Sequence, residues 1–188
     1  MKEIVFVTSN KGKIESARKE LKGVSVLAYE AELIEPRSED IKEIAKQKVM
    51  QAYNIVKKPC IAVDVGFFVK ELNGFPKAYV NHMLGTIGVE GLIKLMKGAG
   101  DRSAEFRHCL AYYDGEIFKF FEDKAEGSIS ESIRGNDNAK KWSELWYIFI
   151  PKWTDKTLAE FTEEDYKKHL ENKDDKCMQD FAKWYLNN

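Results

Sequence analysis

The residues best suited to chemistry near the start of this sequence form a short polar loop. Residues 9–13 (SNKGK) follow an apolar run at residues 4–8 and precede a helical pattern that begins at Ile14. Free backbone N–H groups at a helix N-terminus, together with amide and ammonium groups, suit the binding of a phosphate chain. A solvated turn whose lysines face water explains the same residues, so the loop alone does not establish a site.

Asp64 is the second residue that could carry chemistry. It interrupts residues 60–69 (CIAVDVGFFV), which are otherwise apolar or glycine. An ionised carboxylate there costs free energy unless it is paired or binds a cation. Asp64 is therefore a candidate metal ligand or general base. Backbone hydrogen bonds from the following turn are the structural alternative.

Glu43 is an acidic residue near the start of the second predicted helix, which we expect to run from about Ser38 to about Lys58. The apolar residues of that helix recur at helical spacing, and Glu43 lies on the opposite face. Periodicity alone therefore predicts a solvated glutamate.

Alternating strand and helix patterns must position these residues. In the N-terminal part we expect strands at residues 4–8, 25–28 and 60–69, and helices at residues 14–21 and 38–58. Two short helices at residues 78–84 and 89–97 come next. They precede strands at residues 106–113, 117–121, 128–133 and 146–150, the first two joined by a hairpin at Asp114 and Gly115. The tail from Glu163 is helical, so the patterns predict an α/β fold.

Composition limits the classes of function. The chain has 188 residues and 44% hydrophobic content, which fits one domain, with room for two lobes. A formal net charge of -1 gives no global field toward a nucleic acid polymer or an anionic membrane. Cys60, Cys109 and Cys177 lack the spacing of a zinc or redox site, and no apolar stretch approaches the ~20 residues of a membrane span. We therefore expect a soluble, cytoplasmic protein.

Several motifs together resemble the inosine triphosphate pyrophosphatase family of house-cleaning enzymes. They occur in family order at residues 8–15 (TSNKGKIE), 64–66 (DVG), 72–76 (LNGFP), 85–91 (GTIGVEG), 112–115 (YYDG), 134–135 (RG), 148–151 (IFIP) and 156–160 (KTLAE). The resemblance implies a single two-lobed α/β domain over residues 1–188, a mixed sheet with flanking helices, and a homodimer. It also implies hydrolysis of non-standard purine nucleoside triphosphates to the monophosphate and pyrophosphate, with Mg²⁺ or, as the alternative, Mn²⁺.

The resemblance also assigns roles to residues. Asp64 would activate water and, with Glu43, hold the metal ion, while Lys13 would act in catalysis. Residues that would contact the nucleotide are Thr8, Ser9, Asn10, Lys11, Lys13, Lys48, Gly66 and Arg134.

The sequence departs from the family pattern in three places. Val63 and Val65 replace an acidic and a hydroxyl residue beside Asp64, which removes one metal-site carboxylate. Lys77 and Val80 replace a glycine and a serine after Pro76, so either the loop differs or Lys77 supplies a new contact. The base-recognition segments at residues 136–147 and 172–174 are rewritten.

The rewritten segments leave base recognition open. Trp142, Trp146 and Tyr147 could stack a base or pack in the protein, and His169 could be a displaced base reader or a solvated residue. Two hypotheses follow from this. The first is a metal-dependent pyrophosphohydrolase with altered base specificity, and the second is a paralogue that binds a nucleotide or partner without turnover.

Overall fold

A computed structural model describes residues 2–136, 141, 143–172 and 176–188. Its strands are β1 (Lys2–Val7), β2 (Val24–Tyr29), β3 (Cys60–Val69), β4 (Pro76–Lys77), β5 (Ser103–Tyr113), β6 (Phe118–Ile129) and β7 (Phe149–Pro151). Its helices are α1 (Lys11–Glu20), α2 (Ile41–Val56), α3 (Val80–Thr86), α4 (Gly88–Leu95), α5 (Glu163–Asn172) and α6 (Cys177–Asn187). Short 3-10 turns are η1 (Lys70–Leu72), η2 (Glu144–Tyr147) and η3 (Leu158–Glu160). None of the described helices is long and apolar enough to cross a membrane.

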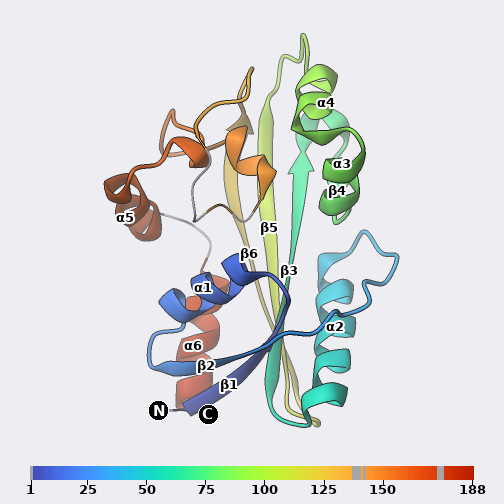
Figure 1. Cartoon of the computed structure of the whole chain (residues 1–188), viewed down its shortest axis with the longest axis vertical. Helices are drawn as coiled ribbons and strands as arrows, with labels where there is room; N and C mark the ends of the chain where they lie inside the picture. The colour runs from blue at the N-terminus through green and yellow to red at the C-terminus, as the bar shows by residue number, and fades with distance from the viewer. Residues whose placement is uncertain (1, 137–140, 142, 173–175) are drawn as a thin grey trace. The chain divides into compact units, whose positions relative to one another are not determined.

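The described strands form one mixed sheet in the order β2-β1-β3-β5-β6-β7, with β4 paired to β3 (Figure 1). Residue contacts divide the chain into two compact units. Unit 1 contains Met1–Val65, His108–Asp123 and Lys176–Asn188, and unit 2 contains Gly66–Arg107 and Lys124–Asp175.

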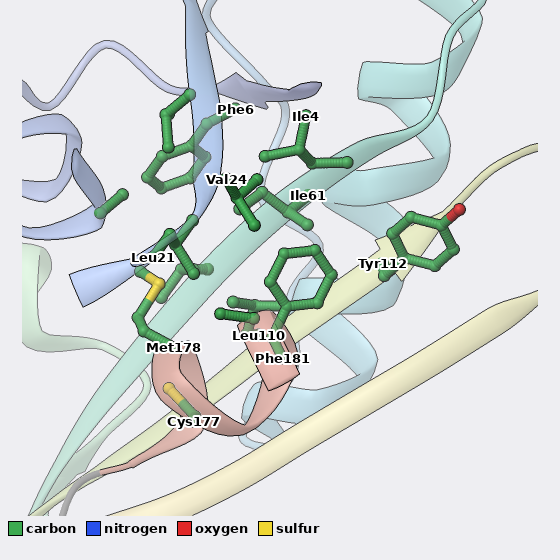
Figure 2. Close-up of a cluster of buried hydrophobic side chains, with 14 residues drawn as sticks. Ile4, Phe6, Leu21, Val24, Ile61, Leu110, Tyr112, Cys177, Met178 and Phe181 are labelled. Carbon is green, nitrogen blue, oxygen red and sulfur yellow. The ribbon is translucent and has the colours of Figure 1, made fainter. Parts of the chain in front are cut away.

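Unit 1 is built on parallel strands. β1 lies between β2 and β3 and runs parallel to both, which explains why Ile4, Val5, Phe6 and Val7 are all buried rather than alternating. Figure 2 shows the core of this unit, where side chains from β1, β3, β5 and α6 converge. Phe181 of α6 is completely buried in this cluster, so the last helix is an integral part of the core.

Unit 2 has its own aromatic core. The rings of Phe67, Phe106 and Phe149 pack together, with centroids 4.7 Å apart for Phe67 and Phe106 and 4.8 Å for Phe106 and Phe149. Arg102 donates to the carbonyl oxygens of Met96, Ile129 and Ser130 and so joins the loop after α4 to the end of β6. The Arg102 guanidinium thus supplies hydrogen-bond donors to the backbone carbonyl groups at the end of β6.

Most predicted elements are confirmed, and the predicted strand at residues 60–69 has the bounds of β3. The separate strand predicted at residues 128–133 is wrong, because β6 continues through Ile129 and the rest is irregular. The strand predicted at residues 146–150 is shorter, because Trp146 belongs to η2. The helical tail is divided into α5 and α6.

Candidate functional site

The polar loop at residues 9–13 forms the N-terminus of α1, as its composition predicts. Asn10 is the N-cap, and its Oδ1 atom accepts a hydrogen bond from the backbone N–H of Lys13 at 3.0 Å. The backbone N–H of Asn10 donates to Thr8 Oγ1 at 3.1 Å. Ser9 and Lys11 are exposed. The loop therefore presents exposed polar groups around a capped helix N-terminus, where the helix dipole favours an anion.

Lys13 extends from this loop to β3. Its Nζ atom donates to the backbone oxygen of Val63 at 3.0 Å, which places the ammonium group beside Asp64. Burial lowers the pKa of Lys13, and the attraction of the Asp64 carboxylate, the largest opposing effect, does not cancel it. A second cation, Lys48, adds to the lowering. The two lysines and Asp64 therefore share one electrostatic environment.

Asp64 is buried and paired with Lys48 of α2. Lys48 Nζ donates to Asp64 Oδ1 at 2.7 Å and to Glu35 Oε1 at 2.5 Å. The Lys48 and Asp64 side chains are 10% and 9% exposed, whereas the Glu35 side chain is 53% exposed. Burial alone would lower the pKa of Lys48, but the carboxylates of Asp64 and Glu35 raise it, so Lys48 is firmly charged.

The second carboxylate oxygen of Asp64, Oδ2, has no hydrogen-bond donor in the described part of the chain. The Lys48 ammonium binds only the first oxygen, Oδ1. A carboxylate with one oxygen held by an ammonium group and the other open can accept a proton or contact a cation. The cluster therefore consists of two lysines, Lys13 and Lys48, and two carboxylates, Glu35 and Asp64.

Glu35 is the residue that sequence reasoning missed. Glu43, which the resemblance assigns to the metal, accepts a hydrogen bond from Gln47 Nε2 at 2.9 Å, one turn along α2. Glu35 lies in the loop before α2, where no pattern in the sequence marks it, and only its pairing with Lys48 links it to Asp64. Within the described residues, no group of three or more histidine, cysteine, aspartate or glutamate side chains is arranged to hold a metal ion.

Gly66 and Arg134 belong to unit 2. The Arg134 guanidinium lies 3.0 Å from Glu160 Oε2 and donates to the backbone oxygen of Asp155 at 2.9 Å. Glu160 also completes a capping box with Thr157 at the start of η3. Arg134 is thus tied to the turn around η3 within its own unit.

The aromatic residues of the rewritten segment pack inside unit 2. Trp146 is 6% exposed and its ring lies 5.9 Å from that of Tyr166, which favours the packing alternative over base stacking for this residue. Tyr147 is half-buried, and its hydroxyl accepts from Lys141 Nζ at 2.9 Å. Trp142 and residues 173–174 of the predicted base segments lie outside the described residues.

His169 is not a solvated residue. Its ring stacks on Trp153 with centroids 5.9 Å apart and contacts Phe161 edge-on. The interpretation of this histidine as a residue facing water is therefore wrong. The two rings that it contacts, Trp153 before η3 and Phe161 directly after it, also pack on each other.

These observations define an α/β protein in which a capped helix N-terminus and two lysines meet a buried carboxylate on a central strand. Such a site is suited to a phosphate chain. Comparison with known proteins identifies the family. The Ham1 family model matches residues 4–184, and the chain belongs to this family.

Relatives of known name cover most of the chain. A dITP/XTP pyrophosphatase of Thermococcus kodakarensis is 33% identical over 187 residues, which is 98% of this chain and 98% of that protein. A dITP/XTP pyrophosphatase of Saccharolobus solfataricus is 39% identical over 142 residues, 73% of this chain and 70% of that protein.

Solved structures show the same fold. A HAM1 protein from Coxiella burnetii has a TM-score of 0.83 at 19% identity, with 100% of each chain covered. The Ham1 protein of Staphylococcus aureus has a TM-score of 0.77 at 23% identity, with 99% of each chain covered. The mixed-sheet α/β fold expected from the sequence is thereby confirmed.

Proposed function

We propose that this protein is a nucleoside triphosphate pyrophosphohydrolase that cleaves non-standard purine nucleoside triphosphates to the monophosphate and pyrophosphate. Water adds to the α-phosphorus, and the bond from that phosphorus to the bridging oxygen breaks, so that pyrophosphate leaves. The observation that carries the proposal is the meeting of Lys13, Lys48 and Asp64 beside the N-terminus of α1. Relatives named dITP/XTP pyrophosphatase support this reaction class.

Each residue of the cluster has a role that its contacts allow. Lys13, with only the Val63 carbonyl as its hydrogen-bond acceptor in the described residues, keeps N–H groups for phosphate oxygens. The α1 N-terminus with Ser9 and Lys11 binds other oxygens of the chain. The open oxygen of Asp64 accepts the proton of the attacking water. Arg134 and Gly66 remain proposed nucleotide contacts on the basis of the family resemblance.

The residues present fit a divalent cation. The Lys48 ammonium already lies between the carboxylates of Asp64 and Glu35, so this donor pair stabilises a cation. Mg²⁺ is commonly held by one or two carboxylates together with substrate phosphates, and Mn²⁺ also takes oxygen ligands. Asp64 is a proposed ligand, with Glu43 or Glu35 as the second carboxylate. When bound, the ion would stabilise negative charge on the leaving pyrophosphate.

Pyrophosphate release from a panel of standard and non-standard ribo- and deoxyribonucleoside triphosphates tests the function. We expect at least one non-standard purine substrate to be cleaved with Mg²⁺ or Mn²⁺, and Asp64→Asn to abolish cleavage while its circular dichroism spectrum stays that of the folded wild type. Unchanged turnover in Asp64→Asn would remove Asp64 from the mechanism. Comparing Glu35→Gln with Glu43→Gln identifies the second metal carboxylate, because only that variant should need a higher metal concentration.

A nucleotide-binding protein without turnover is the second candidate, because Val63 replaces an acidic residue and Lys48 neutralises Asp64. For that candidate, a nucleotide would raise the melting temperature yet remain intact after long incubation. Cleavage by the wild type that Asp64→Asn abolishes would exclude it.

We further propose a cytoplasmic homodimer. All three cysteines are free thiols in the structure, as expected in a reducing compartment. Tyr79, Ile87 and Leu95, at and near α3 and α4, are 40%, 41% and 54% exposed and offer an apolar contact for a second copy. Light scattering should give twice the chain mass, and Leu95→Glu should lower it.

A further inference from the structure

Unit 2 contains a cavity that is separate from the residues discussed above. Its volume is about 920 Å³, within the range of small-molecule sites. Its lining includes Phe68, Lys77, Glu105, Arg107, Glu126 and Lys152. All of these residues belong to unit 2, and none is among the nucleotide or metal residues assigned above.

Lys77, which lines this cavity, has an unusual backbone conformation. Its φ is 56°, in the left-handed region that favours glycine, and glycine is what the resembled family has at this position. The Lys77 side chain runs beside Gly74, since a Cβ atom on that glycine would lie 3.7 Å from Lys77 Cε. A strained backbone that persists in a folded protein is a pointer to function when the side chain has a use there. Here the residue with the strained backbone is a lysine that lines the cavity.

Arg107 gives the lining of the same cavity a flat cationic surface. The Arg107 guanidinium carbon is 4.0 Å from the centroid of the Phe68 ring, so the guanidinium is stacked on the aromatic face. The Arg107 side chain is 49% exposed. A guanidinium supported on one face by a ring can stack another planar group on its other face.

Carboxylates fix this guanidinium without cancelling the charge of the cavity. Glu105 Oε1 accepts from Arg107 at 2.6 Å, and Glu126 lies 2.9 Å from the ammonium of Lys152. Lys70 pairs with Asp101 at 2.8 Å, and Lys124 lies 3.4 Å from Glu105 and 2.6 Å from Glu126. With these neighbours counted, five cations accompany three carboxylates: Lys70, Lys77, Arg107, Lys124 and Lys152 with Asp101, Glu105 and Glu126. This excess of positive charge favours an anionic ligand.

We propose that this cavity is a second nucleotide-binding site, in which a base stacks on Arg107 and phosphate oxygens contact Lys77. The stacked guanidinium of Arg107 suits a planar group, and the Lys77 ammonium suits an anion. A nucleotide joins both in one small molecule. Stacking accepts any base, because every base has an aromatic face. The site is independent of the proposed hydrolysis, so its occupant need not be cleaved.

Calorimetric titration with ADP tests this site, because ADP has no triphosphate to hydrolyse. We expect Lys77→Gly to bind one ADP fewer per chain than the wild type. Lys13→Gln should not remove that site, so a failure of the proposed catalytic site is distinguished from a failure of this one. Lys94→Ala, which removes an exposed cation of α4 outside the cavity, is the control. ADP binding by Lys77→Gly with wild-type stoichiometry and affinity would overturn the proposal.

Lys77→Gly is chosen so that loss of ADP binding cannot be explained by misfolding. Glycine adopts a φ of 56° without strain, so Lys77→Gly should not lower the melting temperature. Arg107→Gln tests the stacking with two probes. We expect ADP to bind about tenfold more weakly at this site and inorganic pyrophosphate to be affected much less. Equal weakening of both probes would refute the stacked base.

Discussion

Replacement of Lys48 by methionine gives the sharpest test of the cluster around Asp64. Methionine keeps the length and apolar packing of the lysine stem but removes the ammonium group that binds Asp64 and Glu35. The variant therefore leaves a buried carboxylate without its partner, and the loss of charge can be separated from the loss of volume.

The expected magnitude follows from burial. Removing one partner of a buried ion pair costs about 3–5 kcal/mol, and the Lys48 and Asp64 side chains are only 10% and 9% exposed. Lys13 still attracts Asp64, so we expect the low end, about 3 kcal/mol. The Glu35 pair adds at most about 1 kcal/mol, because that carboxylate is 53% exposed and screened by water.

Urea unfolding at pH 7 of the wild type, Lys48→Met, Asp64→Asn and the double variant measures this energy. We expect a coupling free energy of about 2 kcal/mol between the two positions, because in the double variant neither member of this ion pair is left buried without the other. Additive effects, or a loss below about 1 kcal/mol in Lys48→Met, would show that the ion pair does not stabilise the fold.

The dependence on pH has a defined sign. The pKa of Lys48 is raised above its ordinary value of 10.5 in the folded protein. The stability that its charge contributes is therefore fully present below pH 10.5 and is lost as pH rises through the raised pKa. The difference between wild type and Lys48→Met should stay constant from about pH 7 to 9 and shrink only in strong alkali.

Two further predictions concern unit 2. Gly127→Ala should cost about 2–3 kcal/mol in urea unfolding, because its Cβ would overlap the backbone oxygen of Ile150. Gly100→Ala, with no atom within 4 Å of the new Cβ, is the control, and equal losses would contradict the clash. Two lysines, chiefly Lys124, lower the pKa of Glu126 to about 2. Its stabilising charge should persist above its ordinary pKa of 4.5 and disappear as pH falls toward 2, and an NMR titration midpoint near 4.5 would contradict this.

The fold was largely predictable because its signals are local. The apolar run at residues 60–69 and the Asp114-Gly115 hairpin each contain the information that decides their conformation. The continuous strand β6 was not predictable in full. The second half of β6 is largely polar in sequence, so no apolar pattern marks it as a strand. Its end, from Gly127 to Ile129, pairs antiparallel with β7, and this contact is distant in sequence.

The residues of the candidate site likewise differ in how far the local sequence predicts them. The loop and Asp64 were recognisable from residue type, and the structure brings Lys13 to within contact of the strand that carries Asp64. Lys48 had a local signal that periodicity reveals, since it lies four residues after Ile44 and four before Ala52 on the buried stripe of α2. Glu35 had none, because only its long-range pairing with Lys48 gives it significance. The roles of all these residues remain predictions.

The positions of the three cysteines make thiol alkylation a probe for the opening of unit 1. Cys60, Cys109 and Cys177 are all buried and all belong to unit 1. Burial raises the pKa of Cys60 and of Cys109 to about 12, so almost no thiolate exists at neutral pH while the unit is closed. A thiol reagent can react only when unit 1 opens. Opening of unit 2 gives no alkylation, because that unit contains no cysteine. The rate of alkylation therefore measures the opening of one half of the protein, with no label added and no residue changed.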